Sequence, residues 1–247
     1  MIKFLYTLLF CCSSLMAFAS PLEKNRWHDF EGMLGNRLTH LSVFIEDDGK
    51  LSGKLCFAGQ LPAWDLQGKL VDTLFQIVAY ENKVPVASIT AAIVSGDADV
   101  LTGEWKNTKS GDKQALKLMY IASCGGDIAH RYTSIDFPDT VAEQFMQQSV
   151  NRIIQKDKKW VAANMLYPLN TSLLGKKGIT IQNEQALLKY YDQIFYPDYV
   201  SRLQSVCFCG LFHNYRGLML GRGELWIGQM PSVKGKKPRL LINAVNN

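Results

Sequence analysis

The stretch 137–228 constrains the fold of this chain most, because helical and strand periodicities succeed one another there in a definite order. Thr140 follows Pro138 and precedes Glu143 by three residues, which is the spacing of a capping box, so we expect a helix to begin there. Apolar residues at helical spacing then predict one buried face for this helix: Val141, Phe145, Val150, Ile153 and Ile154.

Two more helices are expected further along this stretch. Asp157 is a good N-cap for a short helix that must end near Tyr167, because the residue before Pro168 is disfavoured in the α region. Asn183 caps the next helix, and Pro197 begins a further turn. The buried side of that helix is predicted from residues that recur every three or four positions: Ala186, Leu187, Tyr190, Tyr191, Ile194 and Phe195.

The period changes to that of extended chain at Val206. Glycines punctuate the sequence from there onward, and they predict strands at 206–215, 218–220 and 224–228. A last strand is expected at 239–245, after a basic linker. The chain therefore ends in an antiparallel meander.

This order of a helix, a short helix, a strand, a helix and a curved meander resembles the cone-shaped fold of nuclear transport factor 2 and ketosteroid isomerase. Segment 211–228 is similar to the paired late strands of that fold, and segment 159–168 to its second helix. The resemblance covers residues 137–245 and implies an α+β cone of helices packed on a curved antiparallel sheet. The fold serves enzymes, transport adaptors and interaction modules alike, so it fixes no function by itself.

Residues 27–122 have the pattern of an all-β domain. Alternation over 37–46 leads into the hairpin turn 47–50 and a strand at 51–58. Further strands are expected at 66–70, 74–80, 85–94, 100–106 and 114–121. Short polar turns between them favour an up-and-down meander that forms a small barrel or a bent sheet. Its inner face, filled by default, would take residues such as Leu41, Val43, Leu55, Ile77, Ile89, Ile93 and Leu118.

The expected fold class is thus α+β, with an all-β domain followed by the cone. We assign residues 1–19 to a signal peptide, 20–124 to the β-domain, 125–136 to a linker and 137–247 to the cone-fold domain. The linker is placed where both the strand and the helix periods break.

Residues 1–19 follow the plan of a secretory signal peptide, with a lysine, an apolar core, and small residues at Ala17 and Ala19. We expect cleavage after Ala19 and an exported protein, periplasmic or extracellular. Lipidation at Cys11 or Cys12 is a rival interpretation, disfavoured by the bulky residue before Cys11. An uncleaved anchor would need about 20 apolar residues, more than the region has. No membrane-spanning segment is expected after leader cleavage.

Charge gives little reason to expect a nucleic-acid partner. The formal net charge is +5, and the basic residues are spread out apart from segment 234–239. That segment could contact nucleic acid or anionic lipid, but a solvated linker is the favoured interpretation. Aromatic residues do not interleave with it, as they would in a platform for single-stranded nucleic acid.

Four cysteines remain after the leader, and in an exported protein they predict disulfides, with three possible pairings. We expect Cys56 to pair with Cys124, which would tie the end of the sheet to its start. Cys207 and Cys209 alternate on an expected strand, where their Cα atoms would lie about 7 Å apart, outside comfortable disulfide geometry. Buried thiols are favoured there over a bridge to another chain or two ligands of a soft metal.

His213 is the strongest candidate for a chemical role. It lies on the strands that would line the concave face of the cone, and Asp192 or Tyr191 could supply the partner that a general base needs. Tyr191, His213 and Trp226 would together form an aromatic ligand-binding site. A partly exposed strand histidine is the simpler interpretation of His213.

Recognisable catalytic motifs are missing from the sequence. There is no phosphate-binding glycine loop, no nucleophile elbow, and no pair of carboxylates at motif spacing. The catalytic groups of ketosteroid isomerases do not map onto matching positions. We expect no cofactor and no metal.

The favoured function is a non-enzymatic binding or interaction protein of the cell envelope. Its partner would be a small apolar ligand or a protein, and a homodimer is possible. One alternative is a hydrolase or isomerase that uses the concave pocket, with His213 and Asp192. Another is an inhibitor or immunity-type protein that blocks a partner. A pocket where His213 meets an acid would favour the enzyme, and a concavity filled by apolar side chains would favour interaction.

Overall fold

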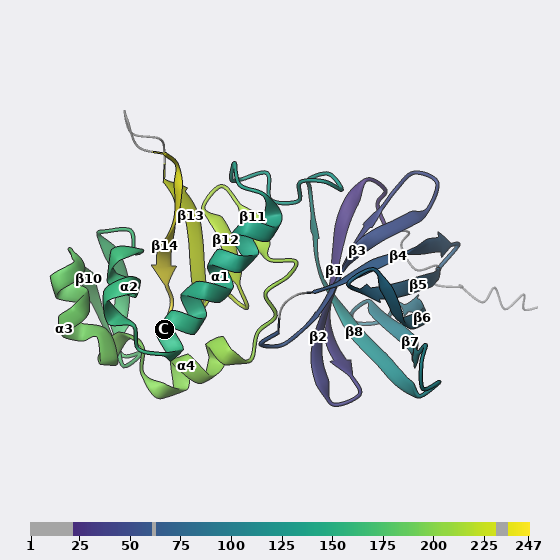
Figure 1. The fold of residues 1–247 in the computed structure, drawn as a ribbon, viewed down its shortest axis with the longest axis horizontal. Helices are drawn as coiled ribbons and strands as arrows, with labels where there is room; N and C mark the ends of the chain where they lie inside the picture. The colour runs from purple at the N-terminus through teal and green to yellow at the C-terminus, as the bar shows by residue number, and fades with distance from the viewer. Residues whose placement is uncertain (1–21, 61–62, 231–236) are drawn as a thin grey trace, which may run out of the picture.

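The computed structural model describes residues 22–60, 63–230 and 237–247, and it places a β-barrel beside a unit of helices and small sheets (Figure 1). The expected signal peptide, residues 1–19, lies outside the described residues, as does the first half of the basic segment 234–239. No helix among the described residues is long and apolar enough to cross a membrane.

The N-terminal unit is a closed antiparallel barrel of eight strands, each paired with its neighbours in sequence, and the last strand pairs with the first. The predicted meander is therefore confirmed, and of the two expected forms it is the barrel. The strands are β1 (Arg26–Leu34), β2 (Arg37–Ile45), β3 (Lys50–Phe57), β4 (Trp64–Val71), β5 (Leu74–Glu81), β6 (Val84–Val94), β7 (Val100–Asn107) and β8 (Lys113–Cys124). Sequence periodicity did not single out β1 as a strand of its own.

Side chains fill the interior of the barrel. Every residue expected on the inner face is buried except Ile93, which is half-buried. Two inward glycines set the path of the strands, because a Cβ at Gly53 or Gly68 would lie 2.1 Å from a backbone oxygen of the adjacent strand. Such small inward residues let a narrow barrel close around its larger side chains.

The C-terminal unit combines four helices with two antiparallel sheets. The helices are α1 (Asp139–Ile154), α2 (Lys158–Ala163), α3 (Glu184–Ile194) and α4 (Pro197–Gln204). A two-stranded sheet contains β9 (Leu169–Leu173) and β10 (Lys177–Ile181). A four-stranded sheet contains β11 (Phe212–Asn214), β12 (Gly217–Leu220), β13 (Leu225–Met230) and β14 (Arg239–Val245). The chain is thus a mixed α+β protein.

The predicted helix caps have mixed outcomes. Asp157 accepts a hydrogen bond from the backbone N–H of Trp160, and Asn183 accepts one from Ala186, so both caps are confirmed. The capping box at Thr140 is wrong, because the N-cap position of α1 is Pro138, two residues earlier, and it has no side-chain cap.

The buried face of α1 is rotated from the predicted one. Its core contacts come from Ala142, Met146, Ser149, Val150 and Ile153, whereas Val141 is exposed. The stripe that begins at Ala142 keeps helical spacing, and Val141 lies about 100° around the helix from it.

One core spans the helices and the four-stranded sheet of the C-terminal unit. Tyr132 and Ile135 belong to this core although they lie in the segment expected to be a linker. That segment contains no helix or strand. It is nevertheless packed between the two units, and this packing positions the site described next.

Candidate functional site

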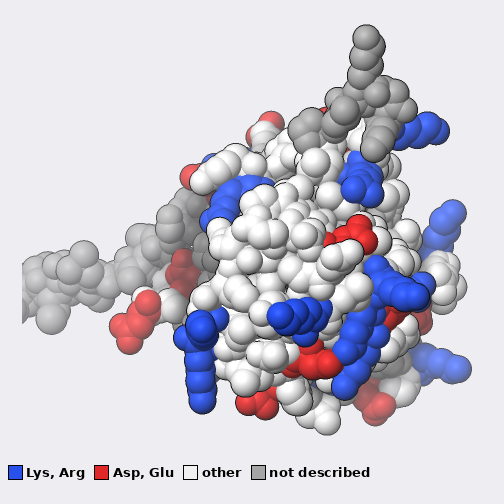
Figure 2. Space-filling model, turned by 90° about the vertical axis from the view of Figure 1, so that its left-hand side faces the viewer, with Lys and Arg blue, Asp and Glu red and all other residues white. Residues whose placement is uncertain are grey.

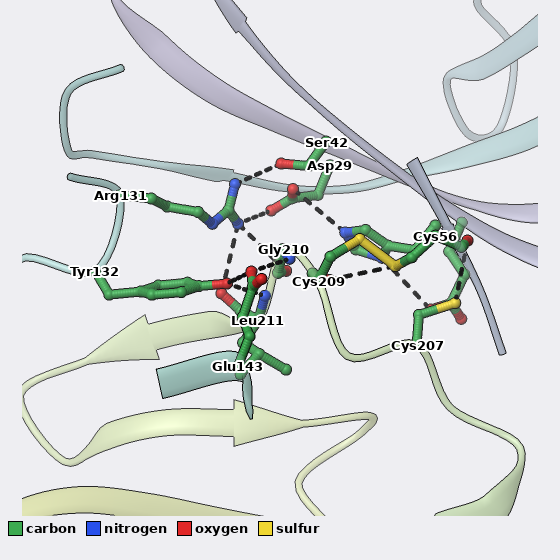
Figure 3. The surroundings of a disulfide bond; sticks show 12 residues. Asp29, Ser42, Cys56, Arg131, Tyr132, Glu143, Cys207, Cys209, Gly210 and Leu211 are labelled. Atoms are coloured by element: carbon green, nitrogen blue, oxygen red, sulfur yellow. Dashed lines mark hydrogen bonds and ion pairs between the residues drawn. A yellow bond between two sulfur atoms is a disulfide. The ribbon is translucent and has the colours of Figure 1, made fainter. Parts of the chain in front are cut away.

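A cluster of buried charged groups lies where the barrel meets the C-terminal unit (Figure 3). Asp29 on β1 stands opposite Ser42 on β2, and Glu31 stands opposite His40. These side chains alternate with residues that fill the barrel, so they point outward. On a free barrel they would be solvated, but the C-terminal unit buries Asp29, His40 and Ser42 and leaves Glu31 half-buried.

Arg131 is the centre of this cluster. Its guanidinium donates hydrogen bonds of 2.6 Å to the Asp29 carboxylate and 2.6 Å to the Ser42 hydroxyl, and two longer ones to the backbone oxygens of Gly210 and Leu211. Burial alone would raise the pKa of Asp29, but Arg131 and His40 together outweigh it and hold that pKa well below its usual range. The pair is therefore a buried ion pair that joins the barrel to the C-terminal unit.

His40 lies between two carboxylates. Its Nε2 is 3.4 Å from Asp29 Oδ1, and its Nδ1 is 3.7 Å from Glu31 Oε2. Burial would lower the pKa of His40, but these two acids raise it above its usual value. The nearby His40 ring in turn lowers the pKa of Glu31. The arrangement favours the charged imidazolium.

A second pair lies below Arg131 and consists of the buried Tyr132 and the half-buried Glu143 (Figure 3). The Tyr132 hydroxyl donates a 2.6 Å hydrogen bond to Glu143 and accepts one of 3.0 Å from the Leu211 N–H. The N–H of Gly210 also donates to Glu143, at 3.3 Å. Burial raises the pKa of Glu143 and raises that of Tyr132 well above its usual value.

A buried acid with a raised pKa is a common feature of catalytic sites. Here, however, the Tyr132 hydroxyl and the Glu143 carboxylate are already engaged by each other and by the backbone of segment 210–211. The side chain of Tyr132 is fully buried. These contacts fix the path of the chain between α4 and β11, which is a structural role.

The disulfide joins Cys56 on β3 to Cys209 in the segment that follows α4. Cys207 and Cys124 are buried free thiols, and the Cys207 sulfur donates to the Cys56 backbone oxygen at 3.5 Å. Burial raises the pKa of Cys207 to about 12. The disulfide thus covalently connects the two units beside the charged cluster (Figure 3).

The expected pairing of Cys56 with Cys124 is wrong. Cys56 is on β3 and Cys124 is on β8, and β1 and β2 lie between these strands in the barrel. Three strand spacings of about 4.8 Å place the two positions roughly 14 Å apart, beyond the reach of a disulfide. Closure of the barrel by hydrogen bonds between β1 and β8 already ties the end of the sheet to its start.

The acid expected to assist His213 is engaged elsewhere. Asp192 is an exposed residue whose carboxylate accepts a 2.6 Å hydrogen bond from Lys158. Tyr191 is buried, and its hydroxyl donates to the Ile153 backbone oxygen at 3.2 Å. Neither contact involves His213.

His213 and Trp226 lie on opposite sides of their sheet. His213 is aligned with Leu218 and Ile227, which belong to the core, whereas Trp226 is aligned with Met219 and packs on Phe212. The His213 ring instead contacts the edge of Tyr132, with centroids 6.0 Å apart. Burial and then the Arg131 charge lower the pKa of His213. The structure therefore does not bring Tyr191, His213 and Trp226 into one site.

Comparisons with protein-family models, with curated proteins and with solved structures found no match for this chain.

Proposed function

We propose that this chain is an exported, non-enzymatic binding protein in which the barrel and the C-terminal unit work as one body. The observation that carries the proposal is the junction itself. A disulfide between Cys56 and Cys209 and a buried pair of Arg131 with Asp29 fasten the two units at adjacent points.

The disulfide supports export. Disulfides persist in oxidising compartments and are rare where thiols are kept reduced. The bond between Cys56 and Cys209 agrees with a leader at residues 1–19, which is the expectation from the sequence. The protein would then act in the periplasm or outside the cell.

The chemistry of the junction supports binding rather than catalysis. A catalytic acid or base needs access to a substrate proton. Arg131, Asp29 and Tyr132 are instead buried and bonded to one another or to the backbone. The core of the C-terminal unit is also filled by apolar side chains, the condition that favours an interaction protein.

We further propose that the C-terminal unit is a cone fold. The hairpin of β9 and β10 lies beside β14, because the Thr171 hydroxyl donates to the Val245 backbone oxygen at 3.0 Å. Val245 ends the strand that borders β13 in the four-stranded sheet. The series β10, β9, β14, β13, β12 and β11 would form the single curved sheet that a cone requires.

Charge on the exposed end of the C-terminal unit does not point to a nucleic-acid partner. Lysine and arginine side chains are scattered among acidic ones over this face rather than gathered in one stripe (Figure 2). A basic stripe or patch is the usual electrostatic mark of nucleic-acid binding. We therefore expect no nucleic-acid partner. For an exported protein, the proposed partner is a component of the cell envelope.

The proposal is tested by expressing the full chain in a bacterium, fractionating the cells, and mixing the purified protein with isolated envelope fragments. We expect the protein in the exported fraction, with Cys56 bonded to Cys209, and co-sedimentation with the fragments. A variant with both cysteines changed to alanine controls for the role of the bond in retention. A cytosolic protein with free thiols, or an exported one that leaves the fragments in the supernatant, would contradict the proposal.

A further inference from the structure

A polar trough crosses the outside of the barrel over β3, β4 and β5. It consists of two adjoining hollows of about 330 and 500 Å³. Both hollows are lined by Ser52, Gln67 and Tyr80, so they form one continuous depression. Neither hollow includes the buried groups of the junction.

The strand register arranges the lining in three parallel rows. Lys50 stands opposite Lys69, Ser52 stands opposite Gln67, and Lys54 stands opposite Asp65. Successive rows are two residues apart along the strands, so the three rows span roughly 13 Å. All of these side chains point outward, away from the filled interior. The trough is therefore built on a rigid sheet.

Hydrogen-bonding groups in the trough are available to a ligand. Among the described residues, no protein group hydrogen-bonds the side chains of Ser52, Gln67, Gln76 or Tyr80. Hydroxyl and amide groups both donate and accept, so they suit a ligand that does the same at many positions. A polyhydroxylated molecule has this property.

The charge of the trough is positive. Lys50 is paired with Glu46 at 3.2 Å, and Lys54 is paired with Asp65 at 2.6 Å. Lys69 and the neighbouring Lys83 have no ion-pair partner among the described residues. A ligand that carries negative charge would neutralise them.

Two aromatic side chains border the trough. Trp27 is held in place by a 3.0 Å hydrogen bond from its indole N–H to the Asp127 backbone oxygen and by packing on Phe44. Tyr80 is half-buried and lies at the overlap of the two hollows. Aromatic side chains of this kind offer a rigid apolar surface with a polar end. Trp27 is buried, so Tyr80 is the side chain that can present such a surface to the C–H face of a sugar ring.

We infer that this trough binds a short anionic oligosaccharide, an inference that rests on the proposed function and names its ligand class. A peptide strand would need a free sheet edge to pair with, and the closed barrel has none among its described strands. Single-stranded nucleic acid would need several aromatic platforms for stacked bases, and the trough offers only Tyr80 and the buried Trp27.

Calorimetric titration of the disulfide-bonded chain with trigalacturonate tests the inference. Maltotriose is the neutral sugar control, and triglutamate is the anion that is not a sugar. We expect trigalacturonate to bind more tightly than either control, and its affinity to fall as salt is raised, because the interaction is partly ionic.

Variants locate the site. Lys69→Ala and Gln67→Ala change exposed side chains, and each should weaken trigalacturonate binding about tenfold or more, the effect of losing one good contact. Lys117→Ala, on the outer face of β8, and Tyr215→Ala, in the turn before β12, are matched controls that should bind as the parent does.

Two results would overturn the inference: equal binding of trigalacturonate and triglutamate, or equal affinity of Lys69→Ala and Lys117→Ala. If the protein is retained on envelope fragments but binds no sugar, the proposed function stands and the trough is not its binding site. A cytosolic location would contradict the proposed function, whether or not the titration shows sugar binding.

Discussion

Arg131 is buried together with the carboxylate that balances its charge. Removing one member of a buried ion pair leaves the other uncompensated, which typically costs about 3–5 kcal/mol. We therefore expect Arg131→Met to lower the free energy of unfolding by about that amount, measured by urea denaturation.

Arg26→Met is the matched control for that experiment. Arg26 also pairs with a carboxylate, at 2.9 Å from Glu23, but these two side chains are 42% and 68% exposed. Exposed pairs contribute about 0–1 kcal/mol, so this variant should unfold close to the parent. Similar losses in the two variants would show that Arg131 is no more important than a surface residue.

His40 should make stability depend on pH. Its folded pKa is raised, so its stabilisation is complete below the unfolded value of about 6.5 and is lost as pH rises through the folded pKa. Asp29, Glu31 and Arg131 face the ring, and Asp29 is ionised throughout this range because its pKa is lowered. We expect the parent to exceed His40→Gln in unfolding free energy by more at pH 5.5 than at pH 9.

Two other histidines make an opposing contribution to the pH dependence of stability, and the comparison with His40→Gln removes it. Burial lowers the pKa values of His28 and His213, so these residues reduce stability as pH falls below about 6.5. They are present in both proteins, and their effect cancels in the difference. A difference that stays constant from pH 5.5 to pH 9 would argue that His40 is neutral in the folded protein.

At the scale of elements, the disulfide fixes the segment between α4 and β11 against β3. The bond joins residues 153 positions apart, and a loop of that length corresponds to about 5 kcal/mol in the chain-entropy model. Changing both Cys56 and Cys209 to alanine should lower the unfolding free energy by an amount of that order.

Cys124→Ala provides the comparison for the disulfide variant, because Cys124 is a buried thiol with no disulfide to lose. Cys124→Ala should lower the free energy of unfolding much less than the double change does, when both variants are unfolded without reductant. Peptide mapping of the parent under the same conditions should recover Cys56 linked to Cys209. Recovery of Cys56 linked to Cys207 would contradict this assignment, because the partner of Cys56 would then be Cys207 and not Cys209.

Local signals predicted those elements whose residues have no stronger partner elsewhere. The strand 239–245 agrees with the structure, and so do the caps at Asp157 and Asn183, because each cap needs only the backbone N–H three residues later. Residues 206–215 were expected as one strand, but only Phe212–Asn214 forms one. The preceding residues cross onto the barrel, where the disulfide and the carbonyl contacts of Arg131 hold them.

The charged cluster could not be predicted for a related reason. Polar residues that alternate with apolar ones on a strand indicate a solvent face, and His40 and Ser42 fit that pattern. Only the tertiary structure shows that another unit covers this face. The sequence likewise predicts Glu143 to be part of a helix cap, whereas its carboxylate is bonded to Tyr132 and Gly210.

At the scale of the whole molecule, the segment 125–136 connects the two units and also completes one of them. Tyr132 is among the largest fully buried side chains, and it packs in the core of the C-terminal unit. A C-terminal fragment that begins at residue 137 would lack Tyr132. Truncating a buried aromatic residue typically costs about 3–5 kcal/mol, and here Glu143 would lose a bond as well.

We therefore expect a fragment of residues 127–247 to show a cooperative thermal transition at a higher temperature than a fragment of residues 137–247. Circular dichroism and heating of both fragments would measure the difference. Tyr132→Phe in the longer fragment separates the two contributions, because it keeps the ring and removes only the hydroxyl. That variant should lie between the two fragments, since leaving a buried polar group unbonded costs about 1–3 kcal/mol. Equal melting temperatures for the two fragments would place the C-terminal unit's boundary at residue 137 and make Tyr132 part of a true linker.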